Sequence, residues 1–113
     1  AAPADVTYLA SKIADARVFA DDNGRMNRSV QEVGGSVLVV SQFTLLGDLR
    51  KGRRPAFDAA ERPEIARALY ESLISQLKNV GIPIEAGVFQ ADMRVELINE
   101  GPVTVLLDSR RLF

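Results

Sequence analysis

SVLVVSQFTL, at residues 36–45, is the stretch that decides the predicted fold. It opens with four consecutive apolar β-formers at residues 37–40. Such a run is typical of a strand buried on both faces, because a half-exposed strand alternates apolar with polar residues. Four polar or aromatic residues follow at once, namely Ser41, Gln42, Phe43 and Thr44. Groups of this kind at the end of a buried strand indicate a site, and a plain strand end with polar residues is the alternative.

The composition bounds the class of protein. A length of 113 residues predicts one small domain over residues 1–113, and a net charge of −1 favours neither a nucleic-acid nor a membrane partner. No apolar run approaches the ~18 residues of a membrane span, and no basic-then-apolar leader opens the chain. The absence of cysteine excludes disulfides and fits a cytoplasmic protein.

The chain also lacks histidine. That removes the usual general base near neutral pH, the Ser-His-Asp and Cys-His arrangements, and most zinc sites. We expect no metal and no cofactor. Any hydrolysis by this chain would rest on positioning, on backbone electrostatics or on help from the substrate.

Two helices are predicted. Pro3 suits the first turn of a helix, and an apolar stripe continues to about Ala16. A second helix begins at Pro63 and ends just before Gly81. Its apolar side is broad enough to face a core, and we interpret Tyr70 within it as a packing residue.

Short strands are predicted around these helices. Residues 18–19 precede a turn at residues 21–24, and residues 82–89 form a strand whose start is weakened by Pro83. Residues 93–97 alternate apolar with charged side chains, the pattern of a strand buried on one face. A turn then returns the chain, which predicts a hairpin with residues 103–107.

A basic loop follows the central strand. It carries four cations around a glycine, namely Arg50, Lys51, Arg53 and Arg54. Their charge makes phosphate the natural partner, although a solvated loop is the usual explanation of a charge run.

SQFTL at residues 41–45 and NEGPVT at residues 99–104 resemble the two signature motifs of the D-aminoacyl-tRNA deacylase family. Further matching stretches occur in the family's order: ARVFADDNGRMNRSV at residues 16–30, KGRRPAF at residues 51–57 and AGVFQADMRVELINEGPVT at residues 86–104. The resemblance implies an α/β fold with layered mixed β-sheets (β/β/α), two main helices and a homodimer. Family members usually carry further strands before the first helix, and this chain departs from them there, either as a fragment or for another reason.

The resemblance implies hydrolysis of the ester bond of D-aminoacyl-tRNA, which releases a free D-amino acid and tRNA as a proofreading step in translation. Glycyl-tRNA mischarged on tRNA-Ala is an implied further substrate, because glycine has no hand. Two alternatives stay open: a non-catalytic relative that binds RNA, and an editing esterase for another mischarged aminoacyl-tRNA.

Site residues also follow from the resemblance. It implies that the Gly101-Pro102 peptide is cis and enters the partner subunit's pocket across a two-fold interface, where it rejects L-aminoacyl groups. It places Phe89, Ala91 and Met93 at the substrate pocket. The basic loop, Arg50 included, is implied to contact phosphates near the acceptor end of the tRNA.

The implied catalytic segment is Ser41 to Thr44. Thr44 is a candidate nucleophile, but it needs an activating base, and the motif supplies neither histidine nor lysine. We therefore favour attack by water, with backbone N–H groups around Phe43 and Thr44 stabilising the oxyanion. Gln42 is expected to support the strand end.

Overall fold

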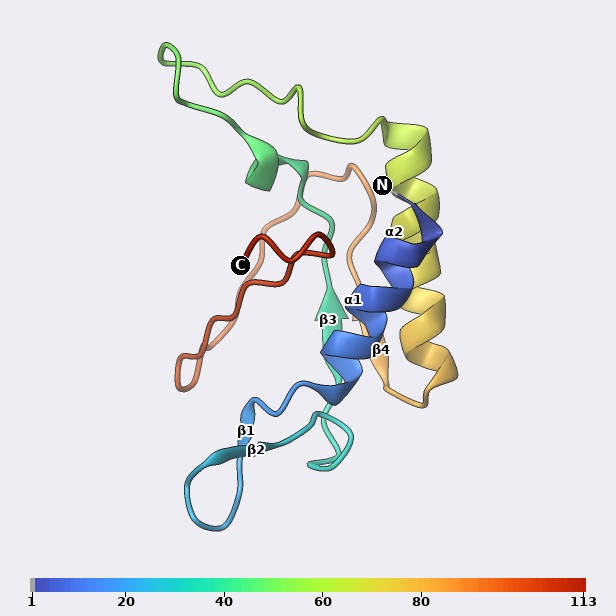
Figure 1. Cartoon of the computed structure of the whole chain (residues 1–113), viewed down its shortest axis with the longest axis vertical. Coiled ribbons are helices and arrows are strands. Elements are labelled where there is room, and N and C mark those ends of the chain that lie inside the picture. The colour runs from blue at the N-terminus through green and yellow to red at the C-terminus, as the bar shows by residue number, and fades with distance from the viewer. Residues whose placement is uncertain (1) are drawn as a thin grey trace.

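The computed structural model describes residues 2–113 (Figure 1). Its helices are α1 (Pro3–Asp15), α2 (Pro63–Asn79) and a 3-10 helix, η1 (Phe43–Leu46). Its strands are β1 (Phe19–Ala20), β2 (Met26–Arg28), β3 (Val37–Val39) and β4 (Ile84–Ala86). Two α-helices with small sheets over this part of the chain confirm the predicted α/β class. None of the described helices is long and apolar enough to span a membrane.

Both α-helices begin and end as predicted, within one or two residues. Each has proline at its first position, where the missing N–H has no intrahelical acceptor to lose. At the end of α2, Gly81 has a φ of +91° and its N–H donates to the carbonyl of Lys78 at 2.9 Å. Glycine adopts this left-handed conformation without a steric cost, which explains where the helix stops.

The helices cover one face of a parallel sheet. β3 pairs with β4 in the register Val37 to Ile84 and Val39 to Ala86, and α2 supplies the crossover that parallel strands require (Figure 1). Side chains of both helices and of the chain just before β3 and β4 form the buried core, namely Ala10, Ala14, Val30, Leu77 and Ile82. Val37 and Val39 pack against it.

The prediction that the central strand is buried on both faces is wrong. Val37 and Val39 point toward the helices, whereas Leu38 is 60% exposed and Val40 is 40% exposed. Successive side chains of a strand point to opposite faces, and within residues 2–113 only one face of this sheet is covered by helices.

Strands at residues 93–97 and 103–107 were also expected, and the structure has none there. Val95 and Leu97 are 55% and 70% exposed, so the alternating pattern buries neither side. A strand needs a backbone partner and a layer to cover its apolar face, and the described residues supply neither to this segment. The chain still turns back on itself there (Figure 1).

The remaining short strands differ in detail. The strand predicted at residues 82–89 is limited to Ile84–Ala86. β1 lies one residue beyond its predicted place and pairs antiparallel with β2, which the sequence did not predict because Met26–Arg28 carries no alternating pattern. Their connection is the predicted turn, in which the Asp21 carboxylate accepts the backbone N–H groups of Asn23 and Arg25.

Candidate active site

β3 leads through three residues into η1, so most of the SQFTL motif forms a short turn of helix beyond the strand end. Gln42 has an extended backbone, and Phe43 and Thr44 open η1. The first N–H groups of a helix have no intrahelical acceptor, which leaves these backbone donors free to bind a ligand. Ser41 is half-buried, whereas the side chains of Gln42, Phe43 and Thr44 are exposed.

The aromatic ring of Phe43 contacts Phe57, which lies at the end of the basic loop. Its centroid lies 4.9 Å from that of Phe57, in an edge-to-face arrangement. Such a pair stabilises by about 0.5–1.5 kcal/mol beyond the apolar area that it buries. This contact was not predictable from the sequence, in which Phe57 is only an apolar residue in a polar loop.

Thr44 has no hydrogen-bonded base among the residues that the structure describes. Among residues 2–113 its hydroxyl makes no hydrogen bond, and its carbonyl accepts the N–H of Gly47 at 3.0 Å. A hydroxyl nucleophile is normally held and activated by an adjacent base. The arrangement therefore agrees with a positioning role for Thr44 better than with a nucleophilic one.

The predicted pocket residues Phe89 and Met93 lie beyond the end of β4. Gly87 donates its N–H to the carbonyl of Val39 at 2.9 Å, which extends the β3–β4 pairing by one step. Met93 packs on Gly87 so closely that a Cβ built there would lie 3.0 Å from the Met93 sulfur. Ala91 is exposed in the turn that follows Phe89.

Phe89 is held by two side chains of α2 that sequence reasoning did not assign to the site. Its ring centroid lies 5.8 Å from that of Tyr70, and the Arg67 guanidinium lies 5.0 Å from it. The one available signal was a tyrosine inside an apolar helix stripe, since a half-buried hydroxyl needs a polar partner.

The Gly101-Pro102 peptide is cis, as the family resemblance implies. Both residues are exposed. The segment around residues 99–104 forms the turn at the lower left of Figure 1, whereas the segment of η1 lies in the upper part of that view. The structure therefore does not bring the two sequence motifs together within one chain.

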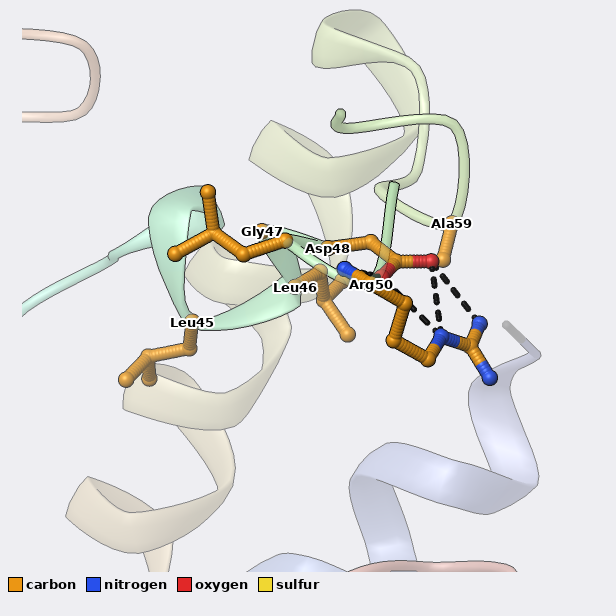
Figure 2. Close-up of a pocket in the computed structure, with 7 residues that line it drawn as sticks. Leu45, Leu46, Gly47, Asp48, Arg50 and Ala59 are labelled. Atoms are coloured by element: carbon orange, nitrogen blue, oxygen red, sulfur yellow. Dashed lines mark hydrogen bonds and ion pairs between the residues drawn. The ribbon is translucent and has the colours of Figure 1, made fainter. Parts of the chain in front are cut away.

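The basic loop projects away from the helices, at the upper left of Figure 1. Arg50 forms a two-pronged ion pair with Asp48, with Nη2 at 2.8 Å from Oδ2, and hydrogen bonds from this guanidinium lower the pKa of the Asp48 carboxyl (Figure 2). The side chains of Lys51, Arg53 and Arg54 are exposed and form no ion pair with any residue that the structure describes. Three of the four cations therefore keep their charge available.

An open hollow of about 510 Å³ lies beside the end of η1 (Figure 2). It is lined by Leu45, Leu46, Gly47, Asp48, Leu49, Arg50 and Ala59. Neither Thr44 nor Phe89 lines it, but Arg50, one of the predicted phosphate contacts, does.

A family model described as D-Tyr-tRNA(Tyr) deacylase matches residues 1–108. The chain belongs to this family. A "D-aminoacyl-tRNA deacylase" of Koribacter versatilis is 59% identical over 112 residues, which cover 99% of this chain and 75% of that protein. A protein of the same name from Anaeromyxobacter dehalogenans is 62% identical over 109 residues, covering 96% and 73%.

Family membership confirms the predicted enzyme class, a hydrolase that acts on the ester bond of D-aminoacyl-tRNA. The fold is also found in a solved structure named "c-Myc DNA Unwinding Element Binding Protein". That protein is 36% identical, with a TM-score of 0.83 over 93% of this chain and 72% of the other.

Proposed function

We propose that the chain removes D-amino acids from tRNA as one subunit of a homodimer, with water as the nucleophile and Gly101-Pro102 of one copy facing η1 of the other. The observation that carries the activity is the match to deacylases over nearly the whole chain. Because the substrate belongs to translation, we assign the reaction to the cytoplasm.

In the proposed reaction, the oxygen of a water molecule attacks the carbonyl carbon of the aminoacyl ester. The carbonyl oxygen becomes an oxyanion, which the free N–H groups at the start of η1 stabilise. The bond to the ribose oxygen then breaks and that oxygen takes a proton, which leaves free D-amino acid and tRNA. An aminoacyl ester is a reactive group, so placement and oxyanion binding supply enough of the barrier reduction without a histidine.

The second copy is proposed to supply the wall that selects the D-form. The Gly101-Pro102 turn is exposed and lies away from η1 of its own chain, which supports its acting on another copy. Exposed apolar side chains along the same segment and on β3 support burial against that copy; they include Leu38, Val95, Leu97, Val103 and Val105.

The backbone of this turn would meet the side chain of an L-aminoacyl group, whereas a D-aminoacyl side chain points outward. Because only the L configuration is rejected, D-aminoacyl groups with many different side chains can be accepted. Glycine has no side chain to reject, so glycyl-tRNA, including that mischarged on tRNA-Ala, is proposed as a further substrate.

The tRNA backbone is proposed to contact the basic loop. Lys51, Arg53 and Arg54 carry the interaction, because Arg50 is already paired with Asp48. Phosphate contacts of this kind orient the acceptor end without reading its sequence.

The first test compares deacylation of D-Tyr-tRNA and L-Tyr-tRNA by the same preparation. We expect turnover of the D-form only. Equal turnover of both would instead indicate an editing esterase of another specificity, and tight tRNA binding without any turnover would indicate an RNA-binding relative.

A mixing experiment tests the second copy. A Gly101→Ala variant disrupts the turn, because a φ of +128° suits glycine alone. A Phe43→Asp variant disrupts η1. Each variant alone should be impaired. Mixed copies should regain D-selective turnover, because one of the two sites in a mixed dimer then combines an intact η1 with an intact turn, whereas a turn acting within its own chain predicts no recovery.

A further inference from the structure

The Tyr70 side chain joins α2 to the ends of both strands of the parallel sheet. Its hydroxyl lies 2.8 Å from the carbonyl oxygen of Gly87 and 3.1 Å from that of Val39. Val39 is the last residue of β3, and Gly87 directly follows β4. A phenol has one proton, so it donates to one of these two acceptors at a time.

The two carbonyls differ in what else they bind. The oxygen of Val39 already accepts the N–H of Gly87 at 2.9 Å. The oxygen of Gly87 has the Tyr70 hydroxyl as its nearest donor, at the shorter of the two distances. Tyr70 therefore stabilises the last backbone pairing of the sheet, at the point where the chain leaves both β3 and β4.

The ring of Tyr70 also packs at this end of the sheet. It lies against Phe89, with the centroids 5.8 Å apart and the planes at 49°. Arg67, three residues earlier on the same helix, lies with its guanidinium 5.0 Å from the centroid of that Phe89 ring. One turn of α2 thus holds Phe89 through two side chains.

We propose that Tyr70 is a positioning residue of the deacylase, which sets the separation between the segment leading from β3 into η1 and the segment that carries Phe89. This inference rests on the proposed function, in which η1 binds the oxyanion and Phe89 lines the substrate pocket. Only Val40 to Gln42 separate the Val39 carbonyl from η1, and Val88 alone separates Gly87 from Phe89. Without the Tyr70 contacts, the segment leading into η1 and the segment carrying Phe89 can move apart.

Tyr70→Phe tests the hydroxyl while keeping the ring. A net hydrogen bond corresponds to roughly a five- to tenfold change in an equilibrium, and water attack depends strongly on placement. We expect kcat for D-Tyr-tRNA to fall by about three- to tenfold with KM nearly unchanged, because tRNA binding through the basic loop is untouched. Tyr8→Phe is the matched control, since it makes the same chemical change on α1, and it should leave both constants unaltered.

Amide hydrogen exchange separates positioning from general stability. In Tyr70→Phe, the Gly87 amide should exchange about tenfold faster, whereas the Val37 amide, which bonds to the Pro83 carbonyl at 3.0 Å at the other end of the sheet, should keep its rate. Ile82→Val, a core change with Ile82 2% exposed, should lower the melting temperature without altering kcat well below that temperature.

Two results overturn the proposal: an unchanged kcat in Tyr70→Phe, or faster exchange spread evenly over the sheet. Failure of the proposed site is recognised separately. A Phe89→Ala variant with full activity would remove Phe89 from the pocket, and wild-type protein without turnover of D-Tyr-tRNA would reject the activity itself. Even if the wild type has no activity, an unchanged exchange rate of the Gly87 amide in Tyr70→Phe would show that the Tyr70 hydroxyl does not stabilise the end of the sheet.

Discussion

The surroundings of the Thr44 hydroxyl bear on the mechanism proposed for the enzyme. It stands at the second position of η1, exposed, and its hydroxyl has no hydrogen-bond partner among residues 2–113. A covalent mechanism needs a base to take the proton from that hydroxyl, and the chain has no histidine to serve. Water attack assisted by backbone N–H groups has no such requirement.

Thr44→Ala should therefore keep most of the deacylase activity, with kcat reduced by less than about tenfold, the usual effect of losing one weak positioning contact. Single-turnover assays with D-Tyr-tRNA measure this directly. Thr44→Ser is the matched control, since it retains the hydroxyl and should behave like the wild type. Complete inactivity of the alanine variant, together with an acyl-enzyme trapped in the wild type, would establish a covalent mechanism instead.

Gly87 is constrained by its neighbour. A Cβ there would lie 3.0 Å from Sδ and 3.3 Å from Cε of Met93, so Gly87→Ala forces the Met93 side chain to move. Methionine is flexible, and we expect a loss of about 1 kcal/mol or less in stability but a clear rise in KM for D-Tyr-tRNA.

The Gly87→Ala prediction is best measured as a double-mutant cycle with Met93→Ala. In the background without the Met93 side chain, adding Gly87→Ala should have little further effect on KM. An equal effect in both backgrounds would show that the clash with Met93 is not the cause.

At the scale of elements, the end of α2 offers the clearest prediction. Gly81 has a φ of +91°, and no atom within 3.4 Å of its built Cβ would oppose a side chain. Gly81→Ala should therefore destabilise through the backbone alone, by about 1 kcal/mol. Denaturant unfolding measures this change, and Ala68→Gly, in the exposed middle of the same helix, should cost about as much for the opposite reason. A neutral Gly81→Ala variant would contradict this explanation of the helix end.

The helices were predictable and the strands only partly so. Proline at each start, a continuous apolar stripe and a glycine at the end of α2 are local signals that specify a helix on their own. A strand depends on a partner distant in the sequence. Val95 and Leu97 alternate as a strand does, yet stay exposed without a neighbour, and Met26–Arg28 forms β2 only because β1 lies beside it.

The candidate site was predictable to the extent that its motifs are contiguous. The sequence placed the SQFTL motif and Phe89 at strand ends, although it did not predict the 3-10 helix, and it indicated a cis peptide at Gly101-Pro102 through the family resemblance. It missed the contacts that run between elements, such as Tyr70 to Gly87 and Phe43 to Phe57, because no local pattern reports which ring meets which backbone group.

At the scale of the whole molecule, charge is distributed unevenly. The net charge is −1, yet the projecting loop carries Lys51, Arg53 and Arg54 without ion-pair partners among the described residues. Each phosphate contact contributes about one unit to the slope of log affinity against log salt.

Replacing Arg53 and Arg54 together by alanine should therefore weaken tRNA binding most at low salt and reduce that slope by about two. Binding titrations over a range of salt concentrations check this. Arg50→Ala is the matched control from the same loop, and it should change the slope less, because its guanidinium is already bound to Asp48. An unchanged slope in the double variant would remove the loop from the tRNA interface.

The edge-to-face contact between Phe43 and Phe57 means that the loop proposed to bind the tRNA and the segment proposed to act on its ester share one aromatic contact. Interactions with a distant part of a substrate can then improve the arrangement of the reacting groups as well as their occupancy. A D-aminoacyl ester cut down to its terminal adenosine would lose both benefits. We expect such a minimal substrate to react slowly even at saturation, so the length of the tRNA becomes part of what the enzyme recognises.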